Sequence, residues 1–508
     1  MFNIRFKNIA ISAYIYIILP IVIFFLTWLR WYIGIPMAIV LVFGLIVLLK
    51  NDYFNNTAEI RLPIKHLIGI GVVILIWTWL SGQGGFFFQT GDNHWRNAIF
   101  RDLINFEWPV IYPETGNGLV YYLMHWIIPA LFGKIFGWTG GNIALLIWTY
   151  LGLMIAYLLI IHVTKATSIK KMWLICIMFI FWSGLNIIGL AISDTLGITV
   201  SKFGLGSAEG WLDYNRNGFD CSYLYRNNFD FLSQVFNQTV VPWIAVPLIL
   251  ENKKIRNFAF IGLSVLPYAP IPFIGFIPIF LVIALPFYVN WIRSKNFKAI
   301  FEETFSIPNI SAVLTIFIVF WFYFKCNVAY SSGAGGNSFG LFVPIEAFDV
   351  QRIFTLILFY ILEFGIVALL IYPMYKKDKL FWTVIFVLII IPLFRIGTGR
   401  DFCMNASLAS LFILMIMTIN FLFEQSEKKI KSIRRNLLIV VLAIAILSPL
   451  SDIALRFHII KDTKQFPIVL DDIKTLSNKQ LLDEKFGSFE NFLSPKPESK
   501  FFYKYLAK

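Results

Sequence analysis

The sequence predicts an all-α fold, a polytopic integral membrane bundle of about 13 transmembrane helices whose extracytoplasmic loops carry short amphipathic helices. Of its 508 residues, 58% are hydrophobic and only 14% are charged, whereas a soluble domain averages about 25% charged residues. Apolar runs long enough to cross a bilayer recur along most of the chain. The net charge of +14 comes from Lys and Arg between these runs, where the positive-inside rule places them, so no nucleic-acid partner is expected.

Three spans are expected before the first long polar loop, over residues 10–28, 33–49 and 67–80. Arg5 and Lys7 precede the first apolar run, and no small-residue cleavage site follows it. We therefore expect this run to remain as a span, with the N-terminus in the cytoplasm. Basic residues between the second and third spans place that connection on the same side.

The first extracytoplasmic loop is expected over residues 81–118. Within it, residues 91–113 read GDNHWRNAIFRDLINFEWPVIYP, which is rich in titratable groups beside otherwise apolar sequence. Residues 98–106 place apolar side chains on one side of a short amphipathic helix, and the prolines that follow end it. Because polar groups are costly near a bilayer, this loop is the leading candidate for a functional site.

Residues 119–136 are long enough to span, but His125, Pro129 and Lys134 interrupt them. The basic stretch at residues 165–171 is expected in the cytoplasm, and residues 143–161 lead down to it. Residues 119–136 would then start and finish outside, as a re-entrant or interfacial helix, although a crossing remains the alternative.

The remaining spans follow from the alternation of apolar runs and basic turns. They are expected over residues 173–192, 235–250, the hairpin 258–289, then 310–324, 354–372, 380–393, 405–423 and 437–450. A second polar loop, residues 193–234, separates the first two of these. We expect one transmembrane domain over residues 1–455 and a small extracytoplasmic tail over residues 456–508.

Asp92 is the candidate catalytic group of the first loop. It lies between Gly and Asn, a turn-like setting that exposes a side chain, and a carboxylate can remove a proton from a hydroxyl group. The alternative is a helix cap. With His94 and Asp102 it could also hold a divalent cation such as Mg²⁺ or Mn²⁺, although no spacing requires a metal and ordinary interfacial polarity is the alternative.

Other polar side chains suggest contacts to phosphate and to hydroxyl groups. Arg96 and Arg101 match phosphate oxygens, with headgroup anchoring as the alternative. Tyr112 and Glu114 suit a polar pocket or a solvated turn. The remaining candidates come from later parts of the chain, with helix caps or loop contacts as alternatives: Asp213 and Gln238 around the second polar loop, and Arg395, Arg400 and Asp401 at a helix start suited to phosphate.

Several motifs are missing. The sequence contains no Walker loop and no HExxH, and GLGSAEG lacks the glycine spacing of a dinucleotide fingerprint. Nucleotide-dependent chemistry therefore has no evident motif, and a lipid-linked substrate used at the outer face fits better.

Several stretches resemble a group of bacterial multi-spanning proteins of the GT-C glycosyltransferase type. The first is GDNHWRNAIFRDLI with WPVIYP and LVYYLMHWIIPALFGKIFG. The later ones are WLDYNRNGFD with LSQVFNQTVVPWIA, LPYAPIPFIGFIPIFLV, and DFCMNASLASLFIL, which is similar to a DFxMRASIPALF motif. The chain departs from the group at two places, because Asn237, Gln238 and Thr239 replace Pro-Gln-His and Asn405 replaces Arg.

The resemblance implies a GT-C-like membrane fold and a function. GT-C enzymes carry an essential acidic residue in the first extracytoplasmic loop, which falls on Asp92 here, and they use polyprenyl-phosphate sugar donors. The expected protein is a glycosyltransferase of the bacterial cytoplasmic membrane that transfers a sugar to a cell-envelope glycan or a lipid-linked acceptor. The alternatives are a transporter or flippase of a lipid-linked glycan, and a polymerase or ligase of surface polysaccharide.

Overall fold

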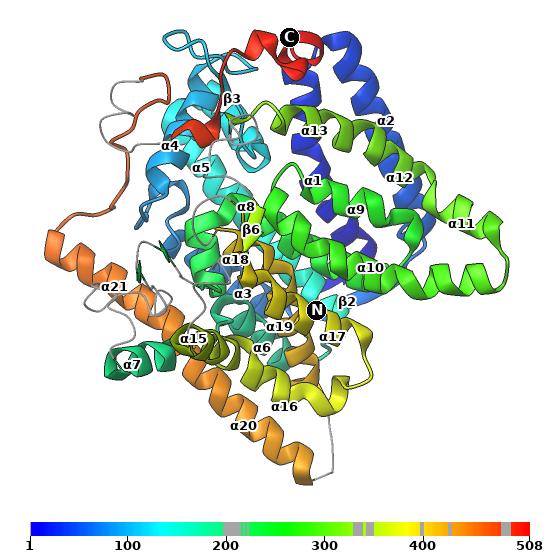
Figure 1. Ribbon diagram of the computed structural model, residues 1–508, viewed down its shortest axis with the longest axis vertical. Helices are drawn as coiled ribbons and strands as arrows, with labels where there is room; N and C mark the ends of the chain where they lie inside the picture. The colour runs from blue at the N-terminus through cyan, green and yellow to red at the C-terminus, as the bar shows by residue number, and fades with distance from the viewer. Residues whose placement is uncertain are drawn as a thin grey trace.

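The computed structural model is built mainly of α-helices, which pack side by side into one bundle (Figure 1). It describes residues 2–196, 215–216, 219–220, 223–328, 339–341, 350–396, 401–424, 429–478 and 489–508. Most of the second polar loop, with Asp213, lies outside the described residues, as does Arg400.

Nine helices in the described part of the chain are long and apolar enough to cross a membrane. Five are single elements: α1 (Phe6–Trp28), α2 (Trp31–Asp52), α5 (Met124–Val163), α8 (Asn228–Glu251) and α10 (Pro270–Arg293). The other four join consecutive elements, namely α12, η4 and α13 (Ile307–Ala312, Val313–Phe317, Ile318–Phe324), α15, η6 and α16 (Val350–Tyr360, Ile361–Gly365, Ile366–Tyr375), α18 and α19 (Asp401–Ala406, Leu408–Phe423), and α20 and α21 (Lys429–Ala445, Leu447–Thr463).

A tenth span is possible where α6 (Ile169–Phe181) and α7 (Asn186–Leu196) meet at a 41° bend. Three apolar segments are shorter: α3 (Ile64–Leu80), η3 with α9 (Ile255–Asn257, Phe258–Val265), and α17 with η7 (Lys379–Ile390, Ile391–Leu393). A multi-pass helical membrane protein is therefore confirmed, and the count of about 13 spans stays a prediction.

Short elements connect the spans. The helical ones are η1 (Gln83–Gly85), α4 (Asn93–Asn105), α11 (Phe297–Thr304), η8 (Phe489–Phe492), η9 (Pro497–Ser499) and η10 (Phe502–Leu506). The strands form antiparallel pairs: β1 (Phe2–Arg5) with β2 (Glu59–Leu62), β3 (Gly118–Leu119) with β8 (Leu493–Ser494), β4 (Asn215–Arg216) with β5 (Phe219–Asp220), and β6 (Phe339–Leu341) with β7 (Phe394–Ile396). The amphipathic helix expected over residues 98–106 is α4.

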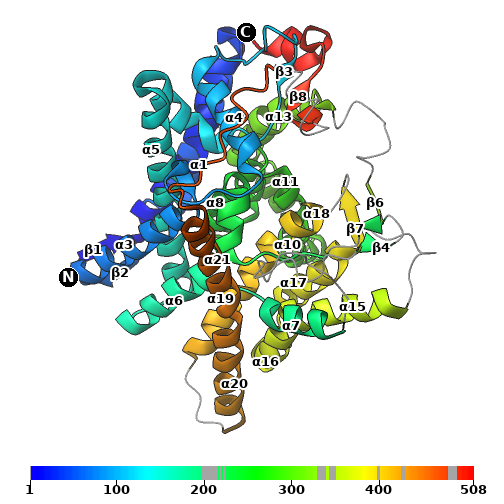
Figure 2. The same cartoon turned by 90° about the vertical axis from the view of Figure 1, so that its left-hand side faces the viewer.

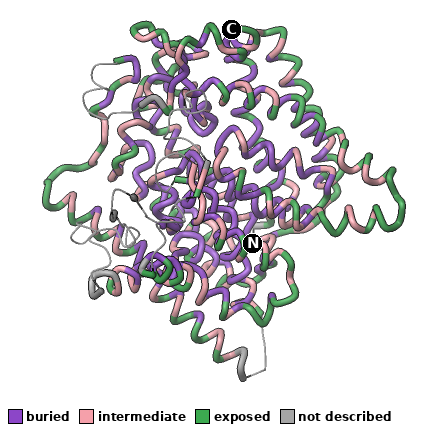
Figure 3. Tube along the Cα trace, viewed as in Figure 1, coloured by how far each residue is buried: buried purple, intermediate pink, exposed green. Residues whose placement is uncertain are grey.

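The outer surface of the bundle is apolar, as a lipid environment requires. Ile39 in α2, Leu281 in α10 and Leu369 in α16 expose 63%, 64% and 69% of their surface. The exposed positions lie at the periphery of the bundle and the buried ones at its centre (Figure 3). In water such a surface would drive association, whereas acyl chains solvate it at no cost.

Helix α8 is central to the bundle and packs against α5, α9 and α19. Its apolar window is 94% buried, and its side chains are apolar or uncharged nearly all round. Asn227 caps its first turn by accepting a hydrogen bond from the backbone N–H of Asp230 at 2.8 Å. At Val235 the backbone leaves the helical region, with φ −137° and ψ 38°, one turn before Gln238.

The chain reverses direction inside α5, at Gly137. This glycine has φ 71° and ψ −173°, a conformation that is essentially confined to glycine. A Cβ atom built on Gly133 would lie 3.4 Å from the Cα of Gly141, although residues eight apart in a continuous helix are about 12 Å apart. Residues 124–136 therefore form a separate helix that packs antiparallel to the next one, and its re-entrant or interfacial placement stays a prediction.

The C-terminal tail returns to the beginning of the chain. It follows α21 to α4, and its last residues lie beside the ends of α1 and α13 (Figure 2). The backbone N–H of Lys508 donates to Trp28 O at 3.1 Å, and Arg30 Nε donates to Ala507 O at 2.9 Å. Strand β8 of the tail pairs with β3, with Gly118 opposite Ser494. The tail is thus packed on the transmembrane helices.

We predict that Gly275→Ala will lower the melting temperature of the purified protein in detergent. The new Cβ atom would lie 2.0 Å from the carbonyl oxygen of Ala406, so α10 and α18 would have to separate. Gly340→Ala is the control, because nothing lies within 4 Å of a Cβ atom there. Equal melting temperatures for the two variants would contradict this close packing.

Candidate functional site

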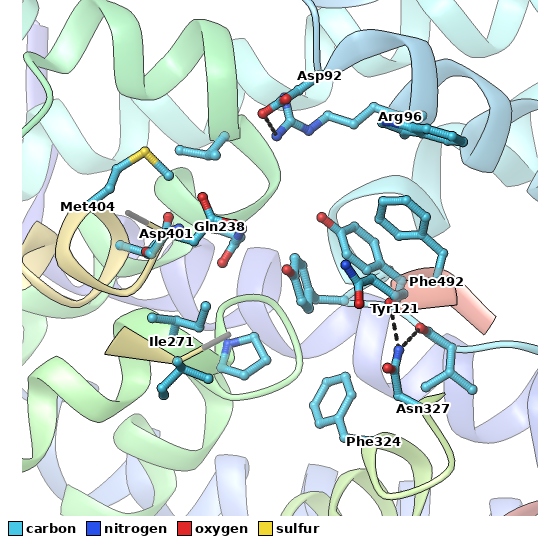
Figure 4. A pocket seen from close by; sticks show the side chains of 18 of the residues that line it. Asp92, Arg96, Tyr121, Gln238, Ile271, Phe324, Asn327, Asp401, Met404 and Phe492 are labelled. Atoms are coloured by element: carbon cyan, nitrogen blue, oxygen red, sulfur yellow. Dashed lines mark hydrogen bonds and ion pairs between the residues drawn. The ribbon is translucent and has the colours of Figure 1, made fainter. Parts of the chain in front are cut away.

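A cavity of about 360 Å³ lies where α4, α8, α10 and α18 converge. Its lining comes from these helices, from the segment before α5, from the end of α13, from β7 and from the C-terminal tail. Four of the predicted site residues line it: Asp92, Arg96, Gln238 and Asp401 (Figure 4). The structure therefore brings together side chains from three helices that are far apart in sequence.

Asp92 and Arg96 form an ion pair across one turn at the start of α4. The Nη2 atom of Arg96 lies 3.1 Å from the Oδ2 atom of Asp92. Asp92 occupies the N-cap position of α4, and its carboxylate makes no capping hydrogen bond to the described residues. Its side chain keeps 60% of its surface exposed, whereas that of Arg96 keeps 7%. The carboxylate is thus accessible, and the arginine holds it in place.

The guanidinium of Arg96 has spare hydrogen-bonding capacity. Its Nε and Nη1 atoms are buried and have no hydrogen-bond partner among the described residues. Buried donors without partners are rare in folded proteins, since each costs about 1–3 kcal/mol. Because a guanidinium presents its donors in a planar fork, these two atoms suit the oxygens of a phosphate group.

Gln238 and Asn405 place amide groups on the wall formed by α8 and α18. Both side chains are buried, with 3% and 2% of their surface exposed. Gln238 Oε1 and Asn405 Oδ1 have no partner in the part of the chain that the structure describes. The sequence analysis noted Asn405 only as a departure from a family motif, so its place in the cavity is new.

The rest of the lining is mainly apolar and aromatic. Ile271 and Ile274 come from α10, Phe324 from the end of α13 and Phe492 from the tail. Ile274 is 39% exposed, so its side chain is accessible to an apolar group in the cavity. Tyr121 lies beside Phe492, and burial raises its pKa. The cavity therefore has a polar side and an apolar side.

The tail contributes one wall of the cavity through Asn491 and Phe492. Asn327 joins this wall to the loop before α5, because its Nδ2 atom donates to Val120 O at 2.9 Å and to Asn491 O at 2.7 Å. Sequence reasoning missed all three positions. Their only sequence signal is their proximity to aromatic residues, which the chain has throughout.

Three predicted residues of α4 contact the tail. His94 pairs with Asp472. Arg101 Nη2 lies 2.6 Å from Asp471 Oδ1, and its guanidinium stacks on Trp138 with 3.8 Å to the ring centroid. Asp102 is fully buried and accepts hydrogen bonds from Tyr112 Oη and from the backbone N–H of Leu476, both at 2.9 Å. None of the three is among the residues that line the cavity.

The remaining predicted residues are also outside the cavity lining. Tyr112 is buried against Asp102, and Glu114 is exposed. Arg395 lies in β7 opposite Gly340 of β6. With Arg400 and Asp213 outside the described residues, the phosphate seat expected around Asp401 stays a prediction.

The side chains considered as ligands of a divalent cation form ion pairs or hydrogen bonds with other side chains. Asp92 pairs with Arg96, His94 with Asp472, and Asp102 with Tyr112. Within the described ranges no cluster of three or more His, Cys, Asp or Glu side chains has the geometry to hold a metal ion.

We predict that Asp102 makes the protein more stable as the pH falls below neutrality. Burial raises the pKa of its carboxyl group to about 6, although hydrogen bonds from Leu476 and Tyr112 oppose the rise. Because an unfolded Asp titrates near about 3.9, this contribution is complete below about pH 4 and is lost as the pH rises through about 6. The melting temperature of the wild type relative to Asp102→Asn should increase from pH 7.5 to pH 5. A difference that does not change with pH would contradict the shifted pKa.

We also predict that Arg101 and Asp471 couple α4 to the tail. In a double-mutant cycle with Arg101→Gln and Asp471→Asn, the two changes should be non-additive by about 1 kcal/mol, the value for a partly exposed pair. Hydrogen exchange of the Leu476 amide, which bonds Asp102, would measure it. Asp462→Asn is the control, because its exposed pair with His458 lies within α21. Additive effects would mean that the pair does not hold the tail.

Comparisons with known proteins do not assign the chain to a family. No family model, curated protein or solved structure matches the chain. The cavity between α4, α8, α10 and α18 and its side chains are therefore the basis for assigning a function.

Proposed function

We propose that the protein is a GT-C-type glycosyltransferase that moves a sugar from a polyprenyl-phosphate donor to a cell-envelope glycan or a lipid-linked acceptor. One observation carries this proposal: an accessible carboxylate, Asp92, lies in a cavity that is polar on one side and apolar on the other. The resemblance of the loop around Asp92 to GT-C proteins supports the same function.

The two-sided lining favours an amphiphilic substrate. Arg96, Gln238 and Asp401 would meet a phosphate and a sugar, while Ile271 and Ile274 would meet the first part of a prenyl chain. Ile274 keeps 39% of its surface exposed, so it is accessible to such a chain. A water-soluble nucleotide sugar has no apolar chain that would contact this side of the cavity.

The proposed reaction is a single displacement at the anomeric carbon. Asp92 takes the proton from the acceptor hydroxyl group as its oxygen forms a bond to that carbon. The bond between the same carbon and the phosphate oxygen breaks, and polyprenyl phosphate leaves with the electron pair. Arg96 stabilises the charge on the leaving phosphate through its unpartnered donors. The configuration at the anomeric carbon is inverted.

The proposed location is the extracytoplasmic face of a bacterial cytoplasmic membrane. Helix α1 begins at Phe6, between the basic residues Arg5 and Lys7, and ends at Trp28, beside the tail that closes the cavity. The positive-inside rule assigns the basic end to the cytoplasm, so the cavity would lie near the other face. A polyprenyl-linked donor is available at that face without a nucleotide.

A transporter of a lipid-linked glycan is the second candidate. Glu363 is a buried carboxylate in the π-helical segment η6, where Asn186 lies within hydrogen-bonding distance at 3.0 Å. Carboxylates at such depth often serve ion coupling in transporters. The enzyme is preferred because Asp92 and Arg96 lie in the cavity, where a substrate can reach them, whereas Glu363 is not among the lining residues.

We predict that Asp92→Asn will abolish sugar transfer while leaving the fold intact. Purified protein in lipid would receive synthetic polyprenyl-phosphate sugars, and release of polyprenyl phosphate would be measured. Loss of a general base slows such reactions by about 10²–10⁴-fold. Because the carboxylate makes no capping bond, the melting temperature should change little.

Glu302→Gln is the matched control, since its exposed carboxylate lies in α11, outside the residues that line the cavity. It should release polyprenyl phosphate at the wild-type rate. If no donor is turned over while both proteins still bind the lipid, the transporter becomes the better proposal. If Asp92→Asn turns over at the wild-type rate, the carboxylate has no catalytic role.

A further inference from the structure

We infer that Gln238 and Asn405 form the sugar-recognition end of the cavity and that this end selects an uncharged sugar. The inference rests on the proposed function, and it adds the orientation of the donor and the class of its sugar. It is carried by two buried amide groups on facing helices, α8 and α18, that both line the cavity.

The two amides have unused acceptor oxygens. Gln238 Oε1 and Asn405 Oδ1 are buried and have no partner among the described residues. The orientation of the Asn405 amide is fixed by its own helix, because Nδ2 donates to Asp401 O at 3.0 Å and the oxygen on the other side of the amide is left without a donor among the described residues. A buried acceptor without a partner costs about 1–3 kcal/mol, which a ligand that donates a hydrogen bond would recover.

The unused groups on α4 differ from those on α8 and α18, and this difference orients the donor. Amide oxygens accept hydrogen bonds, so they suit hydroxyl groups or the N–H of an acetamido group. An ionised phosphodiester has only acceptors and cannot donate a hydrogen bond to these two oxygens. Arg96 instead offers two unpartnered donors, Nε and Nη1. The phosphate therefore belongs beside Arg96, and the sugar beside Gln238 and Asn405.

The same chemistry excludes an acidic sugar. The carboxylate of a uronic acid would face the two amide oxygens, and Asp401, the first residue of α18, lines the same cavity. A carboxylate has no hydrogen to donate to the unpartnered amide oxygens, and it carries the same charge as Asp401. A neutral hexose or N-acetylhexosamine avoids both penalties and supplies the donors that the amide oxygens lack.

The test measures binding of two short-chain lipids, polyprenyl phosphate with and without a neutral hexose. The wild type should bind the glycosylated lipid more tightly. Gln238→Met and Asn405→Leu should each weaken its binding about 3- to 10-fold, the value of one neutral hydrogen bond, while the affinity for the sugar-free lipid stays unchanged. A third lipid that carries a uronic acid should bind the wild type more weakly than the hexose lipid.

Asn237→Leu is the matched control. Asn237 precedes Gln238 in α8, is equally buried, and also has no partner for its amide within the described residues, but it does not line the cavity. An apolar residue of similar size should therefore leave folding and both affinities unchanged. If this variant loses the preference for the glycosylated lipid as strongly as Gln238→Met does, the effect is structural and the inference is wrong.

The outcomes separate the inference from the proposed function. Equal losses for the glycosylated and sugar-free lipids, or no loss in either cavity variant, overturn the sugar-recognition end even if Asp92-dependent transfer is observed. A wild type that prefers the uronic acid overturns the selection of an uncharged sugar. A wild type that binds none of these lipids and transfers no sugar overturns the proposed function, and the inference with it.

Discussion

The buried carboxyl group of Asp102 joins three segments on which the cavity depends. It accepts hydrogen bonds from Tyr112, in the loop after α4, and from Leu476, in the tail. Helix α4 packs against α5, and Asp102 adds bonds to the loop and to the tail that help to fix the direction of the helix. The direction matters because Asp92 lies one residue before the helix and Arg96 in its first turn. A buried polar group thus positions two groups that face the cavity, although it contacts neither.

Helix α8 is the second element that fixes the position of the cavity. It is buried along nearly its whole length, and the departure from helical geometry at Val235 lies within one turn of Gln238. Irregular backbone at such depth is tolerated only where it is buried in protein or lines a cavity, and Val235 itself is a lining residue. The cavity therefore lies where the backbone of the buried helix α8 departs from helical geometry, beside α4 and α10.

The sequence was informative about the spans, because apolar length and basic turns are local signals. It also selected Asp92, Arg96, Gln238 and Asp401, which line the cavity, since their polarity stands out against apolar surroundings. It could not separate these residues from His94, Arg101 and Asp102, which look equally functional in the same stretch. The partners of those three lie in the tail, several hundred residues later, and no periodic pattern in the sequence predicts such a pairing. Asn405 was missed because an amide in an apolar helix has no distinctive pattern.

The pairing of the tail with the first loop also sets the order in which the site can form during synthesis. Asn491 and Phe492 complete the cavity wall, and they follow all the described spans in the chain. Domains form from the N-terminus onward as the ribosome proceeds, so α4 and its carboxylate are made early and must wait for this wall. Until the last stretch has packed beside α4, a growing chain presents Asp92 and Arg96 without the wall formed by Asn491 and Phe492, and the cavity is incomplete.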